Sequence, residues 1–514
     1  MPHVDYIVVG SGLAALSFAA LMARAGRKVL VLEAHDSAGG YAHTFGAGGY
    51  RFNAQLHYVW NTAPDRSVGR VLQKLGIAEA LPFVSLDSQG YDHMRIPGFA
   101  LDVPMDRAEL GRRLCALFPD FRSNLSGFLE ELWATDEGLE ALPERVSAFK
   151  VSHGLGYLAV LRNRDATLQA VFDRFALPLE AQALLALQWP DFLLPPAQLS
   201  FLAWDKLFGR YGRGASYPKL HFESVVQALV GVIVDAGGEV RLQRKVSRFL
   251  FDGARVSGVR SEAVDASGVG TGVFEDVFAG EVVCNMDPRQ AAEQIGLERF
   301  PSGIRARLHY CYAPSSFVAY CGVKDLDLRA YGFGAWNVFH ADGPDLNAIY
   351  EAMYERGDYT RISFAMSTPT LISDAPGSAP EGHQILELLT VANYDRFLQS
   401  HLDQPKAYRE QKQRIFDAMI DVIDSQYVPG IRDHLTVHLT GSPTTSARYA
   451  RAPAGNSYGS AMTPAQVSRN RLDHRTGIPG LWFCNASSGF AGFAGTFWTG
   501  ARLYERLSGC VILA

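Results

Sequence analysis

The chain has 514 residues, of which 48% are hydrophobic and 20% are charged. This composition excludes a disordered protein, and the length favours two domains over one. The net charge of −5 gives no basic surface for nucleic acid, so nucleic-acid binding is not expected.

The six cysteines are scattered, and none of them forms a C-x-x-C pair. This spacing argues against a zinc site or a disulfide scaffold and fits a reducing cytoplasm, so we predict no metal site. No apolar run reaches the ~18 residues that a membrane span needs. The first strand begins at about Tyr6, which leaves no room for a signal peptide. We therefore expect a cytoplasmic protein and leave contact with a membrane surface open.

The first elements are predicted to be a strand, a glycine-rich turn, a helix and a second strand. Residues 6–9 form a short β-branched run, and residues 13–24 are rich in alanine and leucine without a helix breaker. Gly26 ends that helix, and residues 29–32 are a second apolar run followed by an acid. This order predicts a βαβ unit with a parallel sheet.

Helices are predicted for much of the chain between about residues 65 and 211. Apolar residues recur at spacings of three and four over 107–117, 125–142 and 168–187, and Pro178 is expected to interrupt the last of these. A further helix is expected over 223–236, before a pair of glycines.

The middle and end of the chain alternate between strands and helices. Strands are predicted at 240–242, 246–251, 256–260, 282–284, 316–320 and 385–389, with a hairpin turn at 252–253. A long helix is expected over 406–426, and 480–507 returns to strand, glycine-rich turn and helix. We predict a discontinuous nucleotide-binding domain, 1–65, 212–295 and 435–514, and a substrate-binding domain with a helical insert, 66–211 and 296–434.

The turn after the first strand carries a G-x-G-x-x-A motif, which an acid follows about 20 residues later. Gly10 permits the tight turn, Gly12 lets the backbone approach a pyrophosphate, and Ala15 lets helix and strand pack closely. Free N–H groups at the helix start favour the pyrophosphate, and Glu33 accepts hydrogen bonds from ribose, which disfavours NADP. The predicted contacts are Gly10, Gly12, Leu13, Ala14, Ala15, Glu33 and Ala34.

The choice between NAD and FAD depends on the next turn. Gly39 and Gly40 favour FAD, because a second close approach of the backbone suits the longer cofactor. The pair taken alone is also compatible with an ordinary turn.

Six segments carry a resemblance to a known family. They are 39–45 (GGYAHTF), 50–59 (YRFNAQLHYV), 282–288 (VVCNMDP), 441–445 (GSPTT), 455–459 (GNSYG) and 478–482 (IPGLW). In this order they resemble the FAD-dependent phytoene desaturase-like flavoproteins, which include carotenoid isomerase and retinol saturase. The resemblance covers nearly the whole chain.

The resemblance implies a fold and an activity. The fold is an α/β Rossmann-type FAD-binding domain, similar to glutathione reductase and amine oxidase, interleaved with an α+β substrate domain. The activity is formation, reduction or isomerisation of C=C bonds in a long hydrophobic chain: a carotenoid, a retinoid or a fatty-acyl lipid. The electron partner is not implied. Further cofactor contacts are expected at Gly39, Gly40, His43, Thr44, Val246, Asn285, Asn485, Gly495 and Thr496.

The chain departs from the family pattern at two places. Relatives carry Y-P-x-G-G where this chain has 217–221, YPKLH, so both glycines are lost. Many relatives carry an acid after a glycine where this chain has Asn485. We expect Asn485 and backbone N–H groups to hold the lower half of the flavin.

Two histidines are candidates for proton transfer. His57 is the first, because an imidazole exchanges a proton near neutral pH; the alternative is a structural histidine bonded to backbone. His221, which replaces a family glycine, is the second. The aromatic residues of the last segment are expected near the flavin ring or in the core: Phe490, Phe493, Phe497, Trp498 and Tyr504. Residues 189–196 are expected to line a tunnel, to dip into a membrane or to be buried.

Two other functions remain open at this point. A flavin-dependent amine oxidase has a related fold, but the segment around His57 and the segment 282–288 favour the desaturase branch. A non-catalytic prenyl-lipid carrier of the escort-protein type shares the architecture, but such carriers lack the intact phosphate loop found here.

Overall fold

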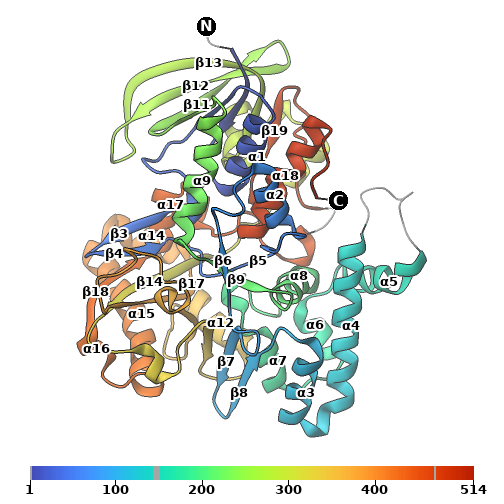
Figure 1. Cartoon of the computed structure of the whole chain (residues 1–514), viewed down its shortest axis with the longest axis vertical. Coiled ribbons are helices and arrows are strands. Elements are labelled where there is room, and N and C mark those ends of the chain that lie inside the picture. Colours follow the sequence, from blue (N-terminus) through green and yellow to red (C-terminus); the bar gives the residue numbers. More distant parts are fainter. Residues whose placement is uncertain (1–2, 143–150, 468–469, 514) are drawn as a thin grey trace.

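The computed structural model describes residues 3–142, 151–467 and 470–513. Two seven-stranded sheets organise the chain, and they lie one above the other in the view of Figure 1. None of the helices in the described ranges is long and apolar enough to cross a membrane.

The first sheet has the strand order β10-β2-β1-β13-β12-β11, and β19 pairs with β13. Its strands are β1 (His3–Val9), β2 (Val29–Leu32), β10 (Glu239–Arg241), β11 (Arg244–Asp252), β12 (Arg255–Val264), β13 (Gly270–Cys284) and β19 (Leu481–Phe483). Strands β10, β2, β1, β13 and β19 are parallel, whereas β11 and β12 extend the sheet as antiparallel neighbours. This arrangement confirms the predicted Rossmann-type α/β class.

Helices cover both faces of the first sheet. They are α1 (Leu13–Arg24), α9 (His221–Asp235), α10 (Pro288–Ile295) and α18 (Phe493–Ser508). Val8 faces the core in which α1 packs against α9 and α18. Its neighbour Ile7 faces a second core on the opposite side of the sheet, which includes α10. This alternation buries the central strands on both sides, which explains why they read as continuous apolar runs.

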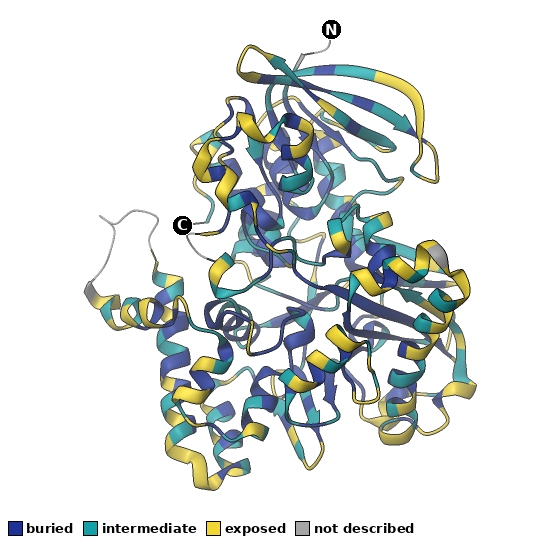
Figure 2. Cartoon of the chain, turned by 180° about the vertical axis from the view of Figure 1, so that it is seen from behind, coloured by how far each residue is buried: buried dark blue, intermediate teal, exposed yellow. Residues whose placement is uncertain are grey.

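The second sheet is mostly antiparallel, with the order β18-β14-β17-β16-β15-β7-β8. Its strands are β7 (Asp92–Ile96), β8 (Phe99–Val103), β14 (Ser315–Val323), β15 (Asn337–Ala341), β16 (Ser363–Ser367), β17 (Gln384–Ala392) and β18 (Leu435–Gly441). The centre of this second sheet is buried (Figure 2). Exposed residues gather on the outer helices and, in the first sheet, at the far end of the β12–β13 hairpin.

Two small sheets lie between the large ones. They are the hairpin of β3 (Thr44–Ala47) with β4 (Tyr50–Asn53), and β9 (Ala215–Pro218) between β5 (Val59–Trp60) and β6 (Phe83–Ser85). The chain crosses several times between the two large sheets in this region, so both contribute to any site there (Figure 1).

The predicted helical insert forms one side of the molecule. Its helices are α3 (Arg107–Leu117), α4 (Arg122–Ala141), α5 (Gly154–Asn163), α6 (Leu168–Arg174), α7 (Leu179–Ala186) and α8 (Phe201–Tyr211). The break expected at Pro178 separates α6 from α7, and Pro178 is the N-cap of α7.

The remaining helices pack around the sheets. They are α2 (Ser67–Leu75), α11 (Ser302–Leu308), α12 (Leu346–Tyr350), α13 (Pro369–Ile372), α14 (Tyr394–Asp403), α15 (Pro405–Gln426), α16 (Ile431–His434) and α17 (Pro443–Tyr449). The domain boundaries given above stay a prediction. Strand β18, just inside the last expected nucleotide-binding segment, pairs with β14 of the second sheet.

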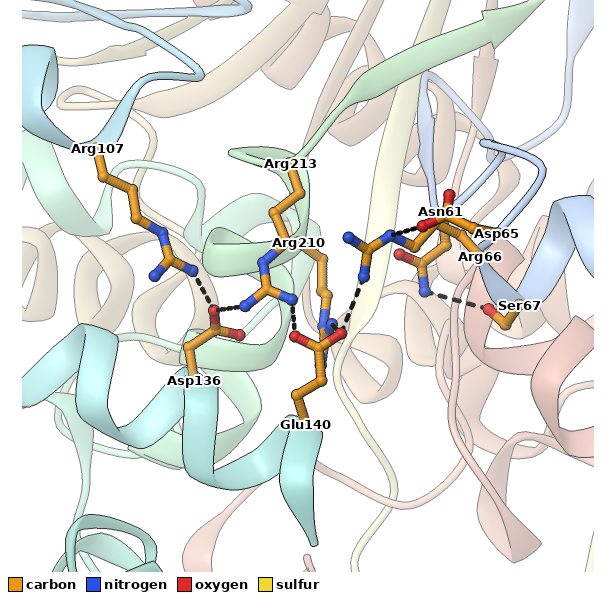
Figure 3. Close-up of polar contacts among 9 residues, drawn as sticks. All are labelled: Asn61, Asp65, Arg66, Ser67, Arg107, Asp136, Glu140, Arg210 and Arg213. Carbon is orange, nitrogen blue, oxygen red and sulfur yellow. Dashed lines mark hydrogen bonds and ion pairs between the residues drawn. The ribbon is translucent and has the colours of Figure 1, made fainter. Parts of the chain in front are cut away.

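An ion-pair network ties the insert to the segment that leads into β9 (Figure 3). Asp136 of α4 is fully buried and accepts hydrogen bonds from Arg107 and Arg213. One turn later, Glu140 pairs with Arg213 and, at 2.9 Å, with Arg210 of α8. Because one partner is buried and each acid has several donors, this network fixes α4 against α8 more firmly than single surface pairs would.

The contact between α1 and α18 leaves no room for a side chain at Gly500. A Cβ there would lie 2.4 Å from the carbonyl oxygen of Ala14 and 2.9 Å from the backbone nitrogen of Phe18. We expect Gly500→Ala to lower the free energy of unfolding by about 1–3 kcal/mol, as overpacking does.

The matched control is Gly231→Ala on α9, where a Cβ meets nothing within 4 Å. Because alanine favours helix over glycine, this change should raise stability by about 0.5–1 kcal/mol. Denaturant unfolding monitored by circular dichroism measures both variants. Equal effects of the two changes would contradict close packing at Gly500.

Candidate functional site

A cavity of about 800 Å³ begins at the carboxyl ends of the parallel strands of the first sheet. It is lined by residues 9–14, 32–35, 39–43, 55–60, 191–192, 244–246, 285–288, 449–453, 456–459, 485–487 and 491–493, among others. In open α/β sheets this edge is where ligands bind, because the strand ends and helix starts leave backbone groups free. The wall on the other side comes from the segments around Tyr58 and Asp191.

The start of α1, directly after the phosphate loop, presents uncapped backbone N–H groups to this cavity. Gly10 has φ +94°, a left-handed conformation that glycine tolerates, and Gly12 is the N-cap of α1. Among the described residues, no side chain caps α1 and no acid lies in its first turn. The helix start therefore favours an anion.

Glu33 and Arg244 complete this end of the cavity. Glu33 Oε2 accepts hydrogen bonds from the Ser11 backbone N–H at 2.8 Å and the Ser11 hydroxyl at 2.6 Å, which holds the carboxylate beside the loop. Arg244 Nη1 is buried without a hydrogen-bond partner in the described part of the chain. A buried guanidinium nitrogen without a partner is costly, so this atom also favours an anionic ligand. These residues fit a dinucleotide cofactor.

The second glycine turn is held by His43. Its Nδ1 lies 2.7 Å from the carbonyl oxygen of Gly40, and both Gly39 (φ +114°) and Gly40 (φ +56°) are left-handed. Burial lowers the pKa of His43, so this ring is neutral and acts through its hydrogen bond.

Asn485 stands where many relatives carry an acid, and it supports a turn. Its Oδ1 accepts the backbone N–H groups of Ser487, at 3.1 Å, and Ser488, at 3.0 Å. Its Nδ2 donates to the carbonyl oxygen of Met286 at 3.1 Å. The amide thus joins the turn after β19 to the end of β13, which a carboxylate cannot do because it has no N–H donor.

The structure brings most of the predicted residues together. Those that line the cavity are His57, Gly10, Gly12, Leu13, Ala14, Glu33, Ala34, Gly39, Gly40, His43, Val246, Asn285, Asn485 and Thr496. Ala15, Thr44, Gly495 and His221 lie outside its lining. Ala15 is fully buried under the loop, and Gly495 packs against the backbone of Phe490.

His221, the second proton-transfer candidate, is buried behind the cavity rather than on its wall. Its Nδ1 lies 3.2 Å from the hydroxyl of Thr44. Its φ of +74° is left-handed, so the chain keeps here a conformation that suits the glycine of its relatives. Burial lowers the pKa of His221 to about 4, which leaves the ring neutral. The position of His221 favours a structural role, in which the ring contacts Thr44, over proton transfer to a substrate.

His57 lines the cavity and is oriented by a carboxylate that the sequence analysis missed. His57 Nδ1 lies 3.2 Å from Oε2 of Glu387, whose side chain is completely buried in β17. His57 Nε2 is buried and has no partner among the described residues. The expected alternative of a histidine bonded to backbone does not describe these contacts. The missed signal was an acid within the apolar run ILELL of residues 385–389.

The aromatic residues of the last segment divide into three groups. Phe493 lines the cavity, and Phe497 and Tyr504 are buried in the core. Phe490 and Trp498 enclose the ammonium of Lys206, which lies 3.1 Å and 5.5 Å from their ring centroids.

The stretch 189–196 is buried, so the alternative of a membrane-dipping loop is wrong. Only two of its residues, Asp191 and Phe192, reach the cavity. The sequence showed the apolar residues of this stretch but not that Asp191 would face the site.

Asn285 provides a test of the site's construction. Its Oδ1 accepts the N–H of Gly12 at 3.0 Å, and its Nδ2 donates to the carbonyl of Cys484. Asn285→Ala leaves both groups unpaired, so we expect it to lower the free energy of unfolding by about 1–3 kcal/mol. Asn470→Ala, at an exposed asparagine, is the control and should change stability little. Equal midpoints of urea unfolding for the two variants would show that the Asn285 bridge is unimportant.

Comparisons with known proteins agree with this geometry. A family model described as an NAD(P)-binding Rossmann-like domain matches residues 8–75. The chain is 25% identical to all-trans-retinol 13,14-reductase of Danio rerio, over 97% of this chain and 84% of that protein. It is 23% identical to prolycopene isomerase 2, chloroplastic, of an Oncidium hybrid cultivar, over 95% and 80%.

Among solved structures, a putrescine oxidase bound to putrescine is similar, with a TM-score of 0.65, 13% identity and coverage of 99% of this chain and 100% of that one. At this identity the likeness shows the fold alone. The resemblance predicted from the sequence segments is confirmed: this chain is related to the phytoene desaturase-like flavoproteins, on the branch that includes retinol saturase and carotenoid isomerase.

Proposed function

We propose that this chain is an FAD-dependent oxidoreductase that forms, reduces or isomerises C=C bonds in a carotenoid, a retinoid or a related hydrophobic chain. One observation carries the proposal: a single cavity joins the dinucleotide loop to His57, a histidine oriented by a buried carboxylate. The relatives named for retinol and prolycopene, which match nearly the whole of this chain, support the substrate class.

FAD is favoured over NAD because the wall of the cavity continues beyond the phosphate loop. From Gly12 and Glu33 it runs through the turn at Gly39 and on to Asn485 and Thr496. A cofactor longer at its redox end can use these contacts. The cofactor residues named from the sequence that line the cavity are carried forward as its proposed ligands. The proposed nucleotide-binding domain comprises 1–65, 212–295 and 435–514.

Bound FAD would supply the hydride chemistry of the reaction. The protein contributes a proton-exchanging group at His57. Because His57 Nδ1 faces the carboxylate of Glu387, Nδ1 carries a proton and Nε2 is the exchanging atom. Phe493 and Leu389 supply apolar wall, which suits a polyene and excludes water.

Cofactor binding is tested with Gly12→Val. A Cβ at Gly12 would lie 2.6 Å from Asn285 Oδ1, so the branched side chain would displace Asn285 and obstruct the pyrophosphate. Wild-type protein reconstituted with FAD should show flavin absorbance at about one FAD per chain, and Gly12→Val should show almost none.

Gly303→Val on α11, where a Cβ meets nothing within 4 Å, is the control and should retain flavin. A wild-type chain that stays colourless after reconstitution would overturn the oxidoreductase proposal and the amine oxidase alternative together.

Activity is tested with two probes, all-trans-retinol in the presence of a flavin reductant and prolycopene with reduced FAD. Chromatography should show loss of a C=C bond from the retinoid or a changed double-bond geometry in the carotenoid. His57→Ala should keep its flavin and lose turnover by about 10²–10⁴-fold, the usual contribution of a positioned acid–base group.

His309→Ala, an exposed histidine, should leave turnover unchanged. Turnover of His57→Ala equal to that of wild type would return His57 to a structural role. Mass spectrometry of lipid extracted from the purified chain would then identify which hydrophobic chain it holds.

A further inference from the structure

One tyrosine hydroxyl lies between two carboxyl groups beside the cavity. The Tyr58 oxygen is 3.0 Å from Asp92 Oδ2 and 2.9 Å from Asp191 Oδ2. Asp92, in β7, is fully buried. Asp191 is partly exposed, and it lines the cavity. A tyrosine hydroxyl donates one proton and so can satisfy only one of two carboxylates. The second contact requires a proton on one of the carboxyl groups.

The surrounding amides act on only one of the two carboxyl groups. Asn337 Nδ2 donates to Asp92 Oδ1 at 3.1 Å, and Gln188 Nε2 donates to Asp92 Oδ2. Donors aimed at both oxygens favour the charged form of Asp92. When Asp92 is charged, the Tyr58 hydroxyl donates to it and the Tyr58 oxygen accepts a proton from Asp191; the reverse arrangement exchanges these roles, so the two carboxyl groups share one proton through Tyr58.

Burial around the pair favours retention of this proton, whereas a charged His57 opposes it at Asp191. The titratable side chains that face it are His57, Tyr91, Tyr211 and Tyr458. No lysine or arginine is among these neighbours in the described part of the chain. Burial raises the pKa of Asp191 to about 6, against the opposing effects of Tyr58 and His57, and it raises the pKa of Asp92 to about 7, against the opposing effect of the amide donors. The pair thus keeps one proton near neutral pH.

We propose that Asp92, Tyr58 and Asp191 form a proton store whose exchanging group is the carboxyl of Asp191 on the cavity wall. The argument stands on the shared hydroxyl, the two amide donors to Asp92 and the position of Asp191 in the cavity. His57 precedes Tyr58 in the chain and influences Asp191 electrostatically, so the store lies beside the proposed proton-exchanging group.

The use of the stored proton rests on the proposed function. Reduction of a C=C bond consumes a hydride and a proton, and bound reduced flavin would supply the hydride. The protonated His57 gives its Nε2 proton to the substrate carbon and becomes neutral. Across the cavity that both residues line, the O–H bond of Asp191 then breaks and an N–H bond forms again at Nε2 of His57. The new carboxylate is left close to the imidazolium and to the Tyr58 hydroxyl, and solvent later restores its proton.

The store itself is tested without substrate, on the full chain, by infrared spectroscopy. The C=O stretch of a protonated carboxyl group is recorded as the difference between wild type and Asp191→Asn. Asp205 is also buried, with no partner for either carboxyl oxygen in the described residues, and burial raises its pKa well above the usual range. Its band is common to both proteins and cancels in this difference.

The expected difference spectrum contains one protonated-carboxyl band. This band should disappear as the pH rises through the range of about 6 to about 7, because a raised pKa means that the proton is lost only there. Asp327→Asn, at an exposed acid, is the control and should give no such band. Absence of the band from the wild-type difference spectrum overturns the proposal.

Tyr58→Phe is the second variant, in case Asp191→Asn does not fold. It removes the shared hydroxyl and leaves both carboxyl groups, so the midpoint of the band's pH titration should shift. An unchanged midpoint overturns the shared-proton arrangement.

Turnover of the FAD-loaded chain with the retinol probe tests delivery of the proton. The rate of retinol reduction by the wild type should fall as the pH rises through about 6 to about 7. Asp191→Asn should retain its flavin, turn over about 10²-fold more slowly and no longer show this fall in rate with pH. If neither probe is turned over while the band is present, the proposed function fails and the store remains. If turnover is normal while the band is absent, the store fails alone.

Discussion

Three segments that are far apart in the sequence meet at one side-chain amide. Asn285 accepts the N–H of Gly12 and donates to the carbonyl of Cys484, so it joins the ends of β1, β13 and β19. Peptide groups just beyond the end of a sheet have lost their strand partners and need others. An amide has both an acceptor and donors, so one residue supplies both. The phosphate loop, the start of α1 and the turn at Asn485 are thereby fixed relative to one another, and they build one wall of the cavity.

Local constraints of this kind explain which parts of the site could be predicted from the sequence. The residues from Gly10 to Glu33 lie in one βαβ unit, and each position imposes a residue type for a local reason: a left-handed turn, a close helix contact or a strand end. Such positions can be recognised without knowledge of the rest of the chain. Pro178 is another example, because proline interrupts a helix whatever surrounds it.

The opposite wall could not be predicted in this way. Glu387 reaches His57 only because β17 lies inside the second sheet, and Asp191 reaches the cavity only because its short turn packs against β7. Both are single acids in apolar surroundings, a signal that marks a residue as unusual without indicating its partner. His221 shows the converse case. The loss of a family glycine was evident in the sequence, but only the structure shows that the backbone kept the glycine conformation, at φ +74°.

The two walls also differ in charge, and this difference has a physical consequence. The wall from the first sheet presents the uncapped N–H groups of α1 and Nη1 of Arg244, which has no partner among the residues that the structure describes; both stabilise anions. The opposite wall presents His57, Tyr58 and Asp191, and no lysine or arginine is among the described groups that act on Asp191. A guanidinium beside Asp191 would stabilise its carboxylate and release the proton to solvent well below neutral pH. Separation of the cations from the acids therefore lets one cavity hold the phosphates of a cofactor and, on its other wall, a carboxyl group that remains protonated.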